Sequence, residues 1–363
     1  MMNLRQSICC LALLAAGVAC KKKDAPQDEA ASSTAAAAAL AANELGAKQL
    51  GGKQQSQARA HLPEGCDLVA TIDWQRLRAM KTMKADIEAG VADLMDPNGK
   101  DAAKKVAEFL QKADIDPLKD PGDIAVCLWR LEQLEQNGTP GFVAIVGGNF
   151  RPGAAIDALD TVSERIGSVV RQVAALAADQ PSQEPERLEI GGVKALLDKE
   201  SGVLVAQAKN GAFVVGNDRE RFEKALTPGA AHTAYRLSPE PAGMALTKSA
   251  GPLFARSAAG SPFAAAAASF EGGHMGFDDA TLRLQAHFGE PTHAALLEQG
   301  IKSLLASAPP GTAEGAKIEV KDKVVSVELP LPEEAMGNLL PLPGTVAPRP
   351  TFPPRAPTTP TTP

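Results

Sequence analysis

The sequence is poor in aromatic residues, which make up 4% of its 363 residues: 11 Phe, two Trp and one Tyr. So few rings leave little for the stacking surfaces that hold single-stranded nucleic acids. Lys and Arg number 37 against 43 Asp and Glu, a formal net charge of −6. Because a nucleic-acid binder needs a basic face for the phosphate backbone, we expect no nucleic-acid partner.

The sequence also lacks the motifs of metal sites and catalytic nucleophiles. It has neither H-E-x-x-H nor a C-x₂-C pair, and each of its five histidines is more than four residues from the next: His61, His232, His274, His287 and His293. No G-x-S-x-G motif occurs, and the glycines after Val146 do not form a phosphate-binding loop. We therefore predict no metal site, no cofactor and no catalytic residue.

The remaining polar groupings fit turns better than sites. His287 and His293 bracket Gly289-Glu290-Pro291, where a strand end and a helix start could share one rim, but we interpret both as surface loop histidines. Two aspartate-rich stretches, 114–117 and 120–123, each contain a proline and lack the alternating ligand spacing of calcium loops. We expect rigid turns there.

Residues 1–19 have the pattern of a signal peptide. Arg5 precedes Ile8–Val18, an uncharged run of 11 residues, whereas a membrane-spanning helix needs about 20. The run ends in Ala16-Gly17-Val18-Ala19-Cys20, which resembles the lipobox of bacterial lipoproteins. The resemblance implies that Cys20 is lipidated and becomes the first residue. An ordinary secretory signal with an incidental cysteine is the alternative.

Lipidation would anchor the chain, since each buried CH₂ of an acyl chain contributes about 0.8 kcal/mol. The residue after Cys20 is Lys21 and not Asp, which resembles the outer-membrane address of Gram-negative lipoproteins. We therefore predict a lipid-anchored protein of the cell envelope, on the outer membrane and facing the periplasm.

Two segments outside the body of the chain are low in large apolar residues. Residues 20–60 are rich in Ala and Gln, which predicts a flexible tether, and residues 341–363 are rich in Pro and Thr, which predicts a disordered tail. The body lies between them. It is predicted to be an α+β fold of two tandem related units, 61–230 and 235–340.

Each unit is expected to contain a mostly antiparallel sheet with helices packed on one face. Strands are predicted where short apolar runs lie between turn residues: Leu68–Ile72, Ile124–Trp129, Phe142–Val146, Val193–Leu197, Val203–Ala206, Ala212–Val215, Gly243–Thr247, His274–Phe277, Thr281–Phe288, Ile318–Val320 and Val324–Leu329. Helices are predicted over Trp74–Leu94, Pro152–Val173, Asp218–Leu226, an Ala-rich stretch from Pro262, residues 291–306 and a short one from Pro332.

Cys66 and Cys127 are the two cysteines of the predicted body. Cys66 precedes the first strand and Cys127 lies in the second, so a disulfide in an oxidising compartment is one interpretation. Two separately buried thiols are the other, and we take them as the main expectation.

Four motifs in the predicted body carry a second resemblance, this time to a protein family: Leu62 to Asp73, Asp116 to Asp120, Val146 to Phe150, and Val214-Val215-Gly216. Together they resemble a family of secreted bacterial proteins of unknown function, many of them lipoproteins. The resemblance covers residues 61–226 or so and continues more weakly to about 340. It implies the fold but no catalytic role.

Two hypotheses of different classes follow. The first is a non-catalytic binding or scaffolding module, with the membrane, an envelope protein or the cell wall as partner. The alternative is a periplasmic hydrolase or transferase whose site lies between the two units, because sites often occur where domains meet.

Overall fold

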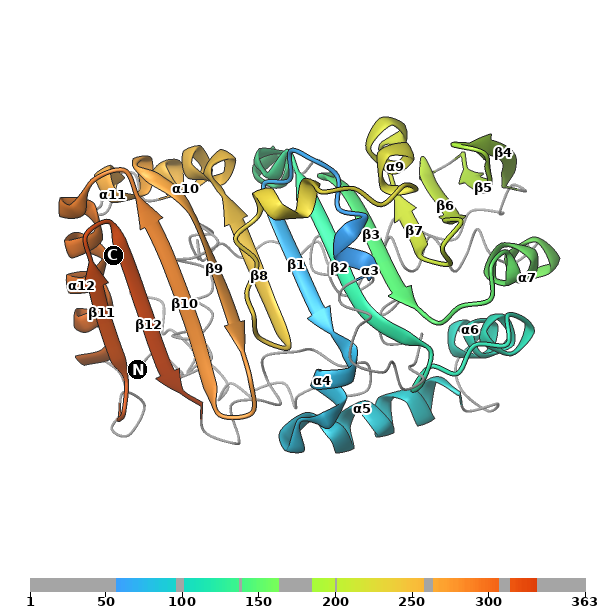
Figure 1. Ribbon diagram of the computed structural model, residues 1–363, viewed down its shortest axis with the longest axis horizontal. Helices are drawn as coiled ribbons and strands as arrows, with labels where there is room; N and C mark the ends of the chain where they lie inside the picture. Colours follow the sequence, from blue (N-terminus) through green and yellow to red (C-terminus); the bar gives the residue numbers. More distant parts are fainter. Residues whose placement is uncertain are drawn as a thin grey trace, which may run out of the picture.

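The computed structural model describes residues 57–95, 101–136, 139–162, 185–199, 201–257, 264–306 and 314–331. The predicted signal peptide, Cys20, most of the tether, the helix beyond Val162, the helix from Pro332 and the Pro/Thr-rich tail lie outside these ranges. Within them the protein is an α+β fold built on one large antiparallel sheet (Figure 1). The predicted fold class is confirmed at this level.

The sheet has 12 strands in the order β11-β12-β10-β9-β8-β1-β2-β3-β7-β6-β5-β4. Their bounds are β1 Leu68–Asp73, β2 Pro121–Trp129, β3 Gly141–Gly148, β4 Glu186–Ile190, β5 Val193–Asp198, β6 Val203–Gln207, β7 Phe213–Gly216, β8 Ala242–Thr247, β9 Phe270–Phe277, β10 Thr281–Phe288, β11 Lys317–Lys321 and β12 Val324–Pro330. All the predicted strands are present, and β4 is an addition.

The two predicted sheets are in fact one. β1 pairs with β2 on one side and with β8 on the other, so that Val69 lies opposite both Cys127 and Ala245. A sheet leaves backbone donors and acceptors unpaired at its edges, and the β1–β8 ladder satisfies those of two strands at once. The sequence predicts a boundary between two sheets at this point. The two halves instead meet at a pair of hydrogen-bonded strands, β1 and β8.

The helices are α3 Gln57–Ala60, α4 Trp74–Ala79, α5 Lys81–Leu94, α6 Asp101–Lys112, α7 Ala154–Val162, α9 Arg219–Ala225, α10 Gly251–Ser257, α11 Ala264–Ala268 and α12 Pro291–Ala306, with 3-10 turns η1 Leu131–Gln136, η3 Ala231–Ala234 and η4 Lys248–Ala250. The single helix predicted over 74–94 is two helices, because Met80 has an extended backbone (φ −66°, ψ 130°). Helix α3 lies inside the stretch predicted as a tether, so folded structure begins by Gln57.

Both faces of the sheet are buried at β2, as alternate residues show. Ile124 packs in a core with Leu110 of α6, whereas its neighbour Ala125 packs in a different core with Ala58 of α3. Successive side chains of a strand point to opposite faces, so α3 and α6 lie on opposite sides of the sheet. A third core joins Ile301 of α12 to Leu282 and other residues of the C-terminal strands.

Candidate functional site: a polar face on the C-terminal strands

Residues directly opposite each other in paired strands point to the same face, so the pairing register traces one row of side chains across the sheet. One such row runs through Val143, Cys127, Val69, Ala245, His274, Gln285 and Ser326. Its first four members are at most 1% exposed. The last three are polar and half-buried. The row therefore changes from core to polar surface between β8 and β9.

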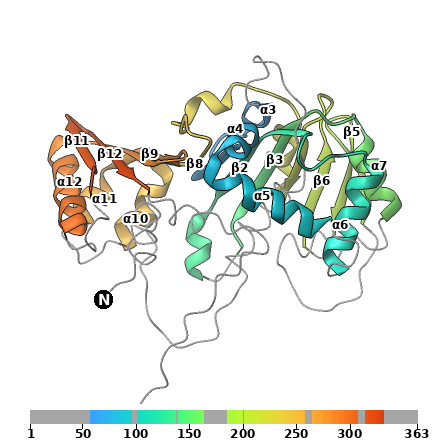
Figure 2. The same ribbon diagram turned by 90° about the horizontal axis from the view of Figure 1, so that it is seen from below.

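We call this surface the polar face and define it by His274 of β9, Arg283, Gln285 and His287 of β10, and Ser326 and Glu328 of β12. Residues of β10 that alternate with these, including Leu282 and Phe288, belong to the core with α12. Figure 2 shows α10, α11 and α12 on one side of these strands and, among the described residues, no helix on the other.

The connection between η3 and β8 borders the polar face. Ser238 is 2% exposed, and a Cβ atom added at Gly243 of β8 or Gly276 of β9 would collide with its side chain. Arg76 of α4 donates to the carbonyl of Pro239 at 2.8 Å. The two glycines thus allow the 235–241 segment to lie directly on β8 and β9.

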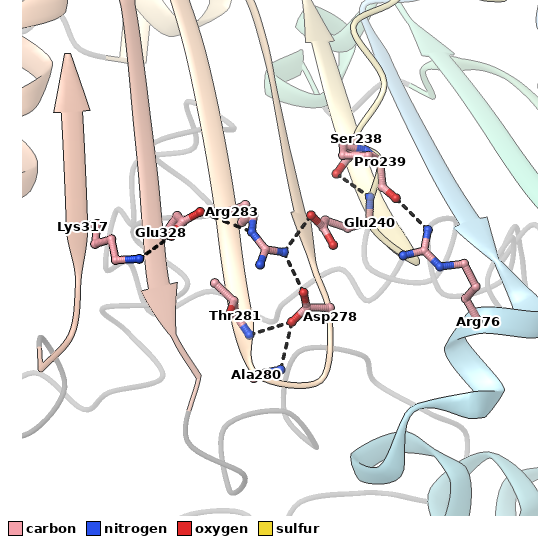
Figure 3. A network of polar contacts seen from close by, with 10 residues as sticks. All are labelled: Arg76, Ser238, Pro239, Glu240, Asp278, Ala280, Thr281, Arg283, Lys317 and Glu328. Atoms are coloured by element: carbon pink, nitrogen blue, oxygen red, sulfur yellow. Dashed lines mark hydrogen bonds and ion pairs between the residues drawn. The ribbon is translucent and has the colours of Figure 1, made fainter. Parts of the chain in front are cut away.

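A network of charges crosses the polar face beside this segment (Figure 3). Nη1 of Arg283 lies 2.8 Å from Glu240 and 2.6 Å from Asp278, and its Nε lies 3.6 Å from Glu328. Lys317 of β11 pairs with Glu328 at 3.3 Å. The Arg283 side chain can reach Glu240 and Asp278 because its partner in β9 is Gly276, which has no side chain to block it. Arg283 lowers the pKa of the Asp278 carboxyl, although burial alone would raise it.

Two histidines lie farther along the same face. His274 lies opposite Gln285, and the Gln285 side chain contacts Nε2 of His287 at 3.2 Å and the Ser326 hydroxyl at 3.4 Å. Burial lowers the pKa of both imidazoles, and the positive charge of Arg236 lowers both further. Both effects favour the neutral form of each ring, and the Arg236 side chain is exposed.

Sequence reasoning did not identify this surface. The alternation of apolar Leu282, Leu284, Ala286 and Phe288 with Arg283, Gln285 and His287 indicates a strand with one polar face. Nothing local connects that strand to Arg236 or Glu240, which arrive from the segment before β8.

The interpretation of His287 and His293 as surface loop histidines is wrong, because His287 lies in β10 and His293 in α12, and the two do not share a rim either. His287 points to the polar face, while Ala286 and Phe288 pack in the core that contains Ala294 of α12. Helix α12 and the His287 side chain therefore lie on opposite sides of β10. Elsewhere, His61 is buried and His232 contacts the carbonyl of Gly229 at 3.2 Å. No group of three or more possible metal ligands occurs among the described residues.

The glycine and aspartate stretches lie partly in strands. Residues 121–123 begin β2 and Gly147-Gly148 end β3, so the expectation of a turn over 120–123 is wrong, whereas 114–117 lie between α6 and β2. A Cβ atom at Gly147 would collide with Asp123 and α3, so this glycine permits close packing at the strand end. The Asp120 carboxylate accepts from the Asp116 backbone N–H at 2.7 Å, and Asp116 accepts from Leu118 at 2.9 Å. These contacts use the carboxylates within the turn itself.

Cys66 and Cys127 form a disulfide, with an S–S distance of 2.05 Å and a Cα–Cα distance of 5.4 Å. The main expectation of two separate thiols is wrong, because Cys127 points to the face that the segment before β1 covers. Both cysteines are at most 1% exposed. The bond ties this N-terminal segment to β2.

Helices in the described ranges are too short or too polar to span a membrane. The two halves meet in one sheet where the alternative hypothesis places its site, since β1 and β8 are paired there along five residue pairs.

Comparisons with known proteins give little further guidance. No protein-family model matches the chain, and no curated protein matches its sequence. Two solved structures, crystal forms I and III of TP0453, are similar with 9% and 8% sequence identity and TM-scores of 0.40 and 0.41. Both comparisons cover 79% of this chain, and they cover 97% and 98% of that protein. Because the TM-scores are below 0.5, we base no argument on this similarity.

Proposed function

We propose that the protein is a lipid-anchored, non-catalytic binding module of the cell envelope, and that the polar face is its binding surface. The observation that carries the binding role is the row of side chains described above, which turns from buried apolar to half-buried polar at β9. Antiparallel sheets commonly face water on one side, so the face needs no covering helix for stability and is available to a partner.

Envelope location is supported by two independent features. The lipobox-like sequence ending at Cys20 would provide the anchor, and the tether that follows would allow the body to reach away from the membrane. The buried Cys66–Cys127 disulfide fits an oxidising compartment, since such bonds are rare in reducing ones. The proposal includes an outer-membrane position facing the periplasm, and Lys21 after Cys20 supports the choice of membrane.

The two halves are further proposed to be related units. Reading outward from the centre, the first half has the order β1-β2-β3-β7-β6 and the second has β8-β9-β10-β12-β11. In each, three antiparallel strands are followed by a helix and by a hairpin whose second strand returns beside the third. Strands β4 and β5 extend the first half beyond β6 and have no counterpart among the described strands of the second half.

Fractionation tests the anchor. We expect Cys20→Ala to move the protein from the membrane to the soluble fraction, while Cys9→Ala leaves it with the membrane because Cys9 lies in the predicted signal peptide. A Cys20→Ala protein that remains with the membrane would contradict the anchor.

Site-specific photocrosslinking in cells tests the binding surface. A photoreactive residue at Gln285 should form a reproducible adduct with an envelope component, whereas the same residue at exposed Lys302 of α12 should not. Equal labelling from both positions, or no adduct from Gln285, would contradict the role of the polar face.

A further inference from the structure

Arg236, His274 and His287 form a cluster on the polar face that the charge network leaves unused. They come from the segment before β8, from β9 and from β10. Arg236 acts electrostatically on both imidazoles, and His274 acts on His287. Geometry places them together as well: Ser238, two residues after Arg236, lies against Gly276 of β9, and both histidines belong to the polar face. Three side chains that are nitrogen donors when protonated thus lie in one region of the sheet.

The guanidinium of this cluster is not engaged. Arg236 is exposed, and its side chain makes no hydrogen bond or ion pair within the described parts of the chain. The two carboxylates that also act on the histidines are both paired with other cations. Glu240 lies 2.8 Å from Arg283, and Glu271 lies 3.8 Å from Lys248. An incoming anion would thus meet Arg236 without displacing an existing partner.

Hydrogen bonding assigns the protons of the two rings. Nδ1 of His274 is buried and has no hydrogen-bond partner among the described residues, and a buried N–H would need an acceptor, so the proton of the neutral ring lies on Nε2. Nε2 of His287 lies 3.2 Å from the carbonyl oxygen of the Gln285 side chain and donates to it. Nδ1 of His287 is then free to gain a proton.

We propose that Arg236, His274 and His287 together bind a tetrahedral oxyanion, the phosphate or sulfate group of a small soluble ligand. The inference rests on the proposed role of the polar face and names the chemistry that the face recognises. Three donors from three segments suit a group with at least three acceptor oxygens, whereas a carboxylate offers two. A soluble ligand is favoured over a lipid headgroup because both imidazoles are half-buried.

Binding should be coupled to one proton. The anion stabilises the charged form of His287, which then donates through Nδ1, while His274 donates through Nε2 in its neutral form. Affinity should therefore rise by up to tenfold for each unit that the pH falls above the His287 pKa in the free protein. Arg236 stays charged throughout and contributes at every pH.

Calorimetric titration of the full-length chain with sulfate tests this inference, because sulfate keeps its charge over the whole range from pH 5.5 to 7.5. We expect saturable binding that is tighter at pH 5.5, with uptake of about one proton measured in buffers of different ionisation enthalpy. Inorganic phosphate should also bind, and acetate should bind at least tenfold more weakly. Absence of sulfate binding at both pH values, or equal binding of acetate, would overturn the proposal.

Three variants separate the roles. Arg236→Gln should weaken sulfate binding about tenfold to a hundredfold at every pH. His287→Gln should remove the dependence on pH. His232→Gln serves as the control, since His232 contacts only a backbone carbonyl, and should match the wild type. If all three variants had the same sulfate affinity and the same dependence on pH, the roles assigned to Arg236 and His287 would be overturned.

A vesicle experiment distinguishes the source of the oxyanion. Vesicles containing phosphatidic acid should not capture the unanchored Cys20→Ala protein more than phosphatidylcholine vesicles do when sulfate binding is intact. Capture by phosphatidic acid without sulfate binding would overturn the choice of a soluble ligand. If Gln285 crosslinks a partner but sulfate does not bind, only this inference fails and the proposed function stands.

Discussion

Asp123 of β2 holds the first helix on the sheet through the backbone N–H of Ala58, which donates to its two carboxylate oxygens at 3.0 and 3.1 Å. The N–H of Arg59 donates to the same carboxylate at 3.4 Å. Asp123 is 7% exposed. Burial raises its pKa to about 6, although these hydrogen bonds lower it. The carboxylate that caps α3 therefore changes charge at mildly acidic pH.

Asp123→Asn should change how stability depends on pH. The folded-state pKa of about 6 lies above the ordinary 3.8, so the contribution of Asp123 is most favourable below pH 4 and is lost as the pH rises through 6. A difference of about two pKa units corresponds to about 3 kcal/mol. In urea unfolding, the stability of Asp123→Asn relative to wild type should therefore increase by about this amount between pH 4 and 7.

His61 also titrates in this pH range, so the effect of Asp123 must be measured as the difference between wild type and Asp123→Asn. Burial lowers its pKa below the ordinary 6.5, so its contribution is present above pH 6.5 and is lost as the pH falls. This opposite trend occurs in both proteins and cancels in their difference. Asp157→Asn is the matched control, because the Asp157 side chain is 69% exposed. A wild-type minus Asp123→Asn difference that is flat with pH would show that Asp123 does not titrate in this range.

His61, which follows α3, also joins the end of α9 to the loop between β6 and β7. Nδ1 of His61 donates to the carbonyl of Ala225 at 2.6 Å, and Nε2 accepts from the Asn210 side chain at 2.8 Å. His61→Ala would leave both groups without a partner in a buried site and would create a cavity. We expect a loss of about 3 kcal/mol in the free energy of unfolding at pH 7. His232→Ala should change it by less than about 0.5 kcal/mol, and equal effects would contradict the structural role of His61.

The strands and their hairpins were predictable because their signals are local. Asp278 lies in the turn between β9 and β10, and its carboxylate accepts from the backbone N–H groups of Ala280 and Thr281 at 3.0 Å each. Turn residues of this kind between two apolar alternating runs identify a hairpin without knowledge of the rest of the fold. Asp218 similarly marks the start of α9, where it accepts from Arg221 at 3.1 Å.

Strand β4 and the β1–β8 pairing lack such signals, whereas α6 was missed although Val106, Phe109 and Leu110 have helical spacing and pack in one core. Strand β4 lies at an edge of the sheet and only Ile190 among its residues is buried, so it shows no clear alternation. The β1–β8 pairing joins Leu68 to Leu246 through backbone hydrogen bonds, which carry no residue-specific pattern. The continuous sheet is therefore a non-local property. The polar cluster could not be predicted either, because Arg236 lies in an irregular segment whose packing on β8 and β9 depends on Gly243 and Gly276.

Removal of the disulfide should be costly. Cys66 and Cys127 are separated by 61 residues, and a cross-link closing a loop of this length restricts the unfolded chain by about 4 kcal/mol in the chain-entropy model. The double variant Cys66→Ala/Cys127→Ala should lose about 2 to 4 kcal/mol of unfolding free energy. Alkylation followed by mass spectrometry provides the companion measurement. Two alkylatable thiols in unreduced native protein would contradict the bond itself.

Arg283→Gln should destabilise the C-terminal strands more than a surface ion pair would suggest. Arg283 neutralises Glu240, whose side chain is only 10% exposed, and also contacts Asp278 and Glu328. Removing one partner leaves a largely buried carboxylate uncompensated, which costs about 2 kcal/mol here, less than for a fully buried pair. Arg283→Lys should recover part of this loss, because an ammonium keeps the charge but cannot direct separate N–H groups at three carboxylates.

The matched control for Arg283 is Lys302 of α12. It pairs with Glu298 at 2.7 Å, but its side chain is 60% exposed, so Lys302→Gln should cost less than about 0.5 kcal/mol. Urea unfolding at pH 7 compares the three variants, and repetition in 1 M salt separates the two kinds of pair. An exposed pair is screened by salt, whereas the cost of leaving Glu240 uncompensated is screened much less. If Arg283→Gln and Lys302→Gln lose stability equally and salt removes both effects, Arg283 acts as an ordinary surface charge and does not organise the polar face.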